Sequence, residues 1–135
     1  MRIPDPAIRK SAAAALDRIR TTPGSEHIRF IILYGSAGAG TMKAGSDIDL
    51  CISLDGDHHD AARFRHEILS RLPGSTYDIQ IFELLPLYVR TEVLRGAVLY
   101  PPDPAIVYET ASRTIREFDD FKHRLYDYTG EEAMS

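Results

Sequence analysis

The sequence predicts an α/β (α+β) domain in which a small mixed sheet has flanking helices. Apolar residues at 28–34 and alternating residues at 47–54 are typical of strands, and apolar residues spaced by three and four elsewhere are typical of amphipathic helices. The 135 residues fit one domain. We expect a core over about residues 26–100, a C-terminal helix over about 104–126 and an acidic tail over 127–135.

The first elements follow from caps and periodicity. Asp5-Pro6 places a capping carboxylate before a proline, a combination that opens helices, and Thr21 to Gly24 ends the helical pattern. Residues 28–34, Ile-Arg-Phe-Ile-Ile-Leu-Tyr, predict a buried strand. A glycine-rich turn follows over residues 35–45.

The strand predicted over residues 47–54 has an aliphatic residue at every second position. This alternation places Asp47, Asp49 and Cys51 together on the opposite face. After a polar turn, apolar residues at helical spacing predict an amphipathic helix that ends before Pro73.

A third strand is predicted over residues 76–82. Its apolar positions share one face, so Asp78 and Gln80 lie on the other. A short helix is expected from Pro86 to about Gly96.

The last helix opens at Asp103-Pro104, because an acidic residue before a proline favours a helix start. We expect its buried stripe to consist of apolar residues at helical spacing. These are Val107, Ala111, Ile115 and Phe118.

Composition excludes several classes of function. Sixteen basic and 20 acidic residues give a net charge of −4 and a pI near 5.7, which disfavours stable nucleic-acid binding. Cys51 is the single cysteine, so an intrachain disulfide and a cysteine-built zinc site are both excluded. The N-terminus lacks a signal-peptide pattern and no apolar run is long enough to cross a membrane. We therefore expect a cytoplasmic protein without membrane contact.

Three carboxylates in predicted strands are the strongest chemical signal. Asp47 and Asp49 lie two apart on one strand face, and Asp78 projects from another strand. Like charges about 7 Å apart along a strand repel each other, and a shared divalent cation would remove that cost. Hard oxygen ligands of this type suit magnesium or manganese bound together with phosphates. A solvated sheet surface is the alternative interpretation.

A glycine-rich turn precedes these carboxylates. Gly35 would allow a phosphate to approach the backbone amides, and the Ser36 hydroxyl could donate a hydrogen bond. The turn is not a Walker A loop, because Thr41 occupies the lysine position.

Together these motifs resemble a known family. Gly35-Ser36, ten residues, then Asp47-Ile48-Asp49 resembles the nucleotidyltransferase signature of the DNA polymerase β superfamily. Tyr77-Asp78-Ile79 matches the segment of the third acidic residue, and 94–100 resembles a C-terminal helix-to-strand segment. The chain is similar to a minimal nucleotidyltransferase (MNT), of the MntA type paired with HEPN toxins, over about residues 26–125.

The resemblance implies a polymerase-β-like fold and a role for each site residue. Gly35, Ser36 and Ser46 would bind the nucleotide. Asp47, Asp49 and Asp78 would be the catalytic and metal-binding residues and would hold two Mg²⁺ ions around ATP.

The resemblance also implies the acceptor, a tyrosine of a HEPN toxin that is silenced by transfer of AMP. One departure concerns a family arginine, because Ala37 and Ala39 stand in its place. Its cation could come from Lys43, Arg29, Arg90 or Arg95. Two alternatives stay open: an antitoxin that neutralises its partner by binding alone, and a nucleotidyltransferase acting on a small molecule.

Overall fold

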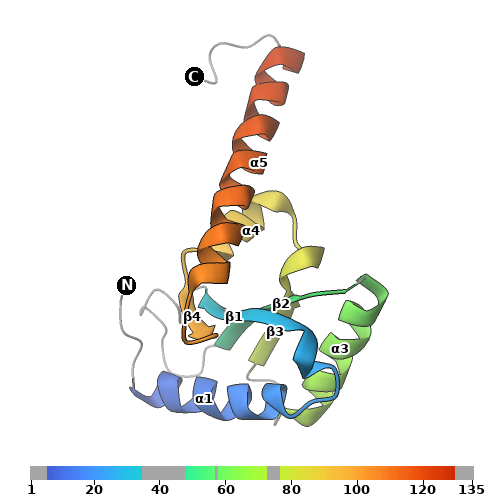
Figure 1. The fold of residues 1–135 in the computed structure, drawn as a ribbon, viewed down its shortest axis with the longest axis vertical. Helices are drawn as coiled ribbons and strands as arrows, with labels where there is room; N and C mark the ends of the chain where they lie inside the picture. Colours follow the sequence, from blue (N-terminus) through green and yellow to red (C-terminus); the bar gives the residue numbers. More distant parts are fainter. Residues whose placement is uncertain (1–5, 35–47, 57, 73–76, 130–135) are drawn as a thin grey trace.

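The computed structural model describes residues 6–34, 48–56, 58–72 and 77–129, and it confirms the predicted fold class. In these ranges helices cover both faces of a four-stranded mixed sheet (Figure 1). The strands are β1 (Ile28–Tyr34), β2 (Ile48–Leu54), β3 (Tyr77–Ile81) and β4 (Ala97–Tyr100). The helices are α1 (Pro6–Arg20), α3 (His58–Arg71), α4 (Leu87–Val93) and α5 (Ala105–Thr129), with 3-10 turns η1 (Ser25–His27) and η2 (Phe82–Leu84).

The sheet order is β3-β2-β1-β4. β1 runs antiparallel to both β2 and β4, whereas β2 and β3 are parallel. The helix α3 connects β2 to β3, and a connection of this kind is what a parallel pair needs. Because β2 and β3 are parallel, both strands begin at the same end of the sheet.

One face of the sheet is closed by α1 and α3. The aliphatic alternation of β2 points here, and Phe64 and Ile68 of α3 pack against it together with Ile19 of α1. These side chains are at most 6% exposed. The periodicity that predicts the two helices therefore also supplies the main hydrophobic core.

The opposite face is covered by α4 and α5. Its apolar cluster is smaller, and Phe30 and Phe82 meet edge to face with ring centroids 5.3 Å apart. Val93 of α4 and Val107 of α5 complete the buried layer. The polar residues of β2 and β3 share this face.

The predicted buried stripe of α5 is wrong beyond its first residue. Val107 is buried, but Ile115 is 54% exposed, and Ala111 and Phe118 are only partly buried. Two threonines, Thr110 and Thr114, complete the buried side of α5. Arg29 of β1 donates a hydrogen bond to the Thr110 hydroxyl, so the threonine side of α5 faces the sheet. The helix also extends to Thr129, three residues beyond the expected end at 126.

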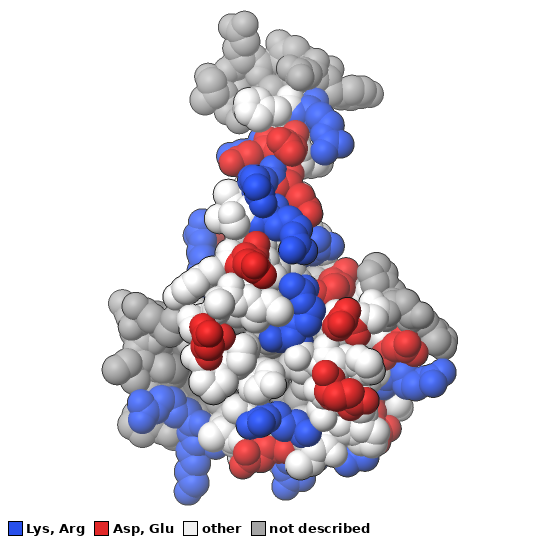
Figure 2. All heavy atoms as spheres, in the orientation of Figure 1, with Lys and Arg blue, Asp and Glu red and all other residues white. Residues whose placement is uncertain are grey.

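The charges on the surface are mixed. Figure 2 shows acidic and basic side chains interspersed along α5 and over the body of the domain on the face in view. No helix within the ranges that the structure describes is long and apolar enough to cross a membrane.

Candidate active site

Three strands place a tyrosine and two aspartates side by side. Tyr34 of β1 pairs with Asp49 of β2, and Asp49 pairs with Asp78 of β3. Paired residues on neighbouring strands are about 5 Å apart and project to the same face. The three side chains therefore form a row across the sheet, where β1 ends and where β2 and β3 begin.

The structure thus brings together two of the three predicted carboxylates. Asp49 and Asp78 are both partly buried. The Gln80 amide, two residues along β3, donates a hydrogen bond of 3.1 Å to Oδ1 of Asp78, which fixes the orientation of that carboxylate. Two neighbouring carboxylates repel each other in a partly buried site, and an Mg²⁺ ion on their oxygens would offset this repulsion.

Tyr34 stays a neutral phenol in this row. Burial raises the pKa of Tyr34 well above its ordinary value, and the electrostatic influence of Cys51, Asp49 and Asp78 raises it further. A neutral phenol can donate a hydrogen bond to a negatively charged oxygen. Tyr34 was not among the predicted site residues. Its place at the end of β1, directly before Gly35, was the signal available in the sequence.

The remaining predicted site residues lie outside the described ranges. These are Gly35, Ser36, Ser46 and Asp47. Within the described residues no group of three or more His, Cys, Asp and Glu side chains could hold a metal ion. Their roles in binding nucleotide and metal stay predictions.

Cys51 lies on the same face as Asp49 but belongs to the packing layer. The thiol is buried, and burial together with the nearby negative charge of Glu83 raises its pKa well above the ordinary value. A protonated, enclosed thiol is a poor nucleophile. Cys51 therefore acts as a small packing residue on this face.

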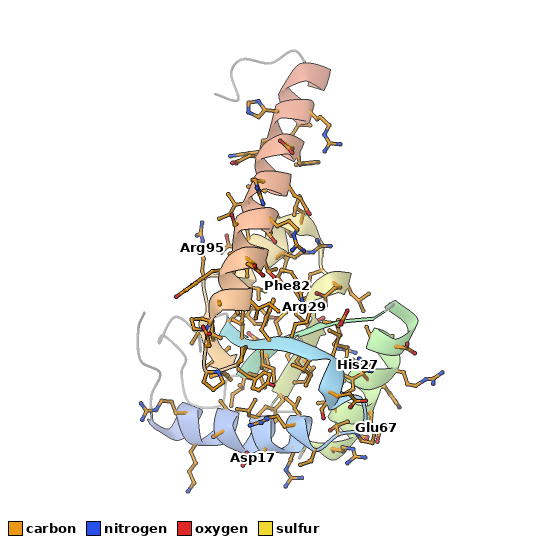
Figure 3. The ribbon with its side chains drawn as sticks, viewed as in Figure 1. Asp17, His27, Arg29, Glu67, Phe82 and Arg95 are labelled. Carbon is orange, nitrogen blue, oxygen red and sulfur yellow. The ribbon has the colours of Figure 1, made fainter. Side chains whose placement is uncertain are left out.

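All three arginines considered as triphosphate cations have carboxylate partners. Arg29 lies five residues before Tyr34 on β1, roughly 17 Å away along the strand. Its guanidinium donates to Thr110 Oγ1 at 3.1 Å and lies 3.9 Å from Glu83. Arg90 donates to the Leu85 carbonyl oxygen and pairs with Glu117. Arg95 lies 3.8 Å from Glu92. Figure 3 shows Arg29 and Phe82 close together, and Arg95 on the other side of α5 in this view.

The Glu83 cluster is a feature that sequence reasoning missed. Glu83 accepts hydrogen bonds from the Ser53 hydroxyl at 2.6 Å and from the Leu54 amide at 2.9 Å. Arg29 connects this carboxylate to α5 through Thr110. The cluster joins β1, β2, η2 and α5, and it explains why α5 turns its threonines toward the sheet. A serine at an inward position of β2 was the only hint in the sequence.

The row of acidic side chains on this mixed sheet agrees with a family match. Residues 19–105 match the family described as polymerase beta, nucleotidyltransferase. The chain belongs to this family. The fold and the family implied by the sequence resemblance are therefore confirmed.

A curated relative supports the same grouping. The chain is 41% identical over 67 residues to the "Putative protein adenylyltransferase MJ1547" of Methanocaldococcus jannaschii. The match spans 49% of this chain and 49% of that relative, so the chain matches about half of the relative's length.

Solved structures share the fold at low sequence identity. A chain of a toxin–antitoxin complex with AMP-PNP has a TM-score of 0.63 at 18% identity and covers 93% of this chain and 98% of its own length. A chain of the complex of a tri-AMPylated Shewanella oneidensis HEPN toxin with its MNT antitoxin has a TM-score of 0.64 at 15% identity. That match covers 95% of this chain and 99% of the other.

Proposed function

We propose that this chain is an Mg²⁺-dependent adenylyltransferase that transfers AMP from ATP to a tyrosine of a HEPN-type toxin and acts as its antitoxin in the cytoplasm. The observation that carries the proposal is the pairing of Asp49 with Asp78 at one edge of a polymerase-β nucleotidyltransferase sheet. Carboxylates at this position suit the metal and proton chemistry of nucleotidyl transfer. The acceptor class is supported by the solved complex that contains an AMPylated HEPN toxin.

The donor set fits magnesium. Asp49 and Asp78 offer hard oxygen ligands on adjacent strands, and Asp47 precedes β2 by one residue in the sequence. Bound Mg²⁺ would neutralise charge on the triphosphate. Gly35, Ser36 and Ser46 would hold the phosphates through backbone amides and hydroxyls.

The chain's own residues then serve an in-line displacement. The acceptor phenol oxygen forms a bond to the α-phosphorus, and the bond between that phosphorus and the bridging oxygen of pyrophosphate breaks. Asp78, oriented by Gln80, accepts the phenol proton. Tyr34, held neutral beside both carboxylates, can donate to an oxygen of the bound nucleotide. The products are an AMP-tyrosine ester and pyrophosphate.

The decisive experiment mixes the purified chain, ATP labelled at the α-phosphate, Mg²⁺ and the HEPN-type partner. We expect label on a partner tyrosine with the wild-type chain and with Asp17→Asn, an exposed carboxylate on α1 that serves as the matched control. Asp49→Asn and Asp78→Asn should abolish the label. Equal labelling by these two variants, or no labelling by wild type, would exclude the proposal.

Two alternatives give different results in the same experiment. If the Asp49→Asn/Asp78→Asn variant still neutralises the toxin and no label appears with wild type, the chain acts by binding alone. If label moves from ATP to an added small molecule and never to the partner, the acceptor is a small molecule.

A further inference from the structure

The large exposed apolar side chains come from the elements that cover one face of the sheet. Among the described residues, five large hydrophobic side chains are at least 44% exposed, and none lies on α1 or α3. They come from η2, α4 and α5: Leu84, Tyr88, Tyr108, Ile115 and Phe121. Apolar surface concentrated in this way marks an interaction site more often than scattered single residues do.

A groove runs between the two helices that carry this surface. Its volume is about 480 Å³. The α5 side contributes Ala111, Ile115 and Phe118. The side of α4 and the turn after it contributes Tyr88, Thr91 and Leu94, together with the ion pair of Glu92 and Arg95, which lie 3.8 Å apart. The lining is mainly apolar, so it suits an apolar side chain from a partner.

Along α5 the groove positions continue into a stripe that is apolar except at Lys122. Its members recur at intervals of three and four residues, the spacing of a helix-packing seam about 26 Å long. They are Tyr108, Ala111, Ile115, Phe118, Lys122 and Leu125. No side chain from Ile115 to Leu125 is buried, and Figure 1 shows this part of α5 standing clear of the sheet. A helix segment this short has marginal stability without packing.

We propose that the α4–α5 groove and the α5 stripe dock an amphipathic helix of the toxin partner, an inference that rests on the proposed function. The helices α4 and α5 cover the sheet face on which Asp49 and Asp78 lie. A partner seated here lies on the side of the sheet that carries these two carboxylates. The opposite face is closed by α1 and α3.

The charge within the stripe favours a partner over a second copy of this chain. Lys122 is the one charged member of the stripe and is about half exposed, 4.0 Å from Asp119. In a parallel α5–α5 pair Lys122 would face its own copy, and in an antiparallel pair it would face an apolar member of the stripe. In neither arrangement does a member of the other chain's stripe offer the ammonium an acceptor. The fitting occupant is an apolar helix stripe with an acidic residue opposite Lys122.

The test measures binding of the full chain to the partner by calorimetry without nucleotide. Ile115→Asp and Tyr88→Asp each place a charge in the groove at an exposed position and should raise the Kd for the partner by about 30-fold or more. Lys122→Glu should raise this Kd by about tenfold. Ala14→Asp, an exposed site on α1, should leave Kd unchanged. Circular dichroism confirms that each variant is folded.

A second measurement does not depend on any variant. Hydrogen exchange of the wild-type complex should slow at residues 115–125 and not in α1. Unchanged Kd in both groove variants, or no protection of α5, would overturn the docking surface. A wild-type dimer that Ile115→Asp converts to monomers would assign the surface to a second copy and overturn it as well. Normal binding without any transfer of label would refute the proposed function and leave the docking surface standing.

Discussion

The sheet face beneath α1 and α3 is closed by aliphatic side chains, whereas the face beneath α4 and α5 carries carboxylates and hydroxyls beside a smaller apolar cluster. On the first face every second residue of β2 is aliphatic. On the second face the same strand presents Asp49, Cys51 and Ser53. The period of two separates a face for stability from a face for chemistry. The following variants test how complete this separation is.

The largest effect is expected from the two aspartates. Asp49→Asn and Asp78→Asn should each lower the rate of AMP transfer by roughly 10² to 10⁴-fold, because each removes a carboxylate needed for metal binding or proton transfer. The free energy of unfolding should stay within about 0.5 kcal/mol of wild type or rise, since two neighbouring negative charges repel each other. Labelled-ATP assays and urea titrations measure the two quantities. A fall in stability as large as that of a core variant would mean that the carboxylates also hold the fold.

The reverse pattern is expected on the closed face. Ile68 of α3 is 1% exposed and packs in the main core. Ile68→Ala should lower the free energy of unfolding by about 2–5 kcal/mol, and Ile68→Val by about 1 kcal/mol, because each leaves a cavity of different size. Transfer activity per folded molecule should be unchanged for Ile68→Val. A large loss of its specific activity would show that the two faces are coupled.

A smaller loss is expected from the polar cluster that attaches α5. Glu83→Ala removes the acceptor of the buried Ser53 hydroxyl and of the Leu54 amide, so it should cost about 1–3 kcal/mol. Glu83→Gln keeps one acceptor oxygen and should cost less. Thermal melts of both variants measure the difference. Equal stability of Glu83→Ala and wild type would mean that water replaces the carboxylate.

The extent to which sequence predicts this molecule differs between the two faces. Local periodicity predicts β1, β2, β3, α1 and α3, and it correctly assigns Asp49 and Asp78 to one side of their strands. Pairing them as neighbours requires the order β3-β2-β1-β4, which depends on contacts between segments far apart in the sequence. The glycine–serine and aspartate motifs indicated the family, which hydrophobic periodicity alone does not identify.

The orientation of α5 shows why the rest was out of reach. Hydrophobic periodicity predicts Ile115 on the buried side, but burial of Thr110 and Thr114 is favoured by Arg29 and the Glu83 cluster. That interaction joins residues 81 positions apart, so no local window contains it. The exposed apolar stripe that results is the basis of the proposed docking surface.

The smallest effect is expected from Cys51, on the sheet face that carries Asp49. Ionisation of its thiol should make the free energy of unfolding depend on pH. Burial and Glu83 raise the pKa of this thiol in the folded chain, whereas in the unfolded chain it ionises near its usual value of about 8.5. Above that pH the unfolded state binds fewer protons than the native state, so stability falls as pH rises. The contribution approaches about 1.4 kcal/mol per pH unit. Below about pH 8 the thiol contributes no pH dependence.

Cys51→Ala removes the contribution of the thiol to the pH dependence of stability. Urea titrations between about pH 8.5 and 9.5 avoid most of the contribution from Tyr34, whose phenol ionises near pH 10 when unfolded. The variant should be less stable than wild type at pH 7, because it leaves a small cavity, yet its stability should fall less steeply with pH. Parallel pH profiles would refute the raised pKa, as would rapid reaction of the native thiol with a disulfide reagent at pH 8. A shallower profile would show that Cys51 packs the chemical face as a neutral side chain.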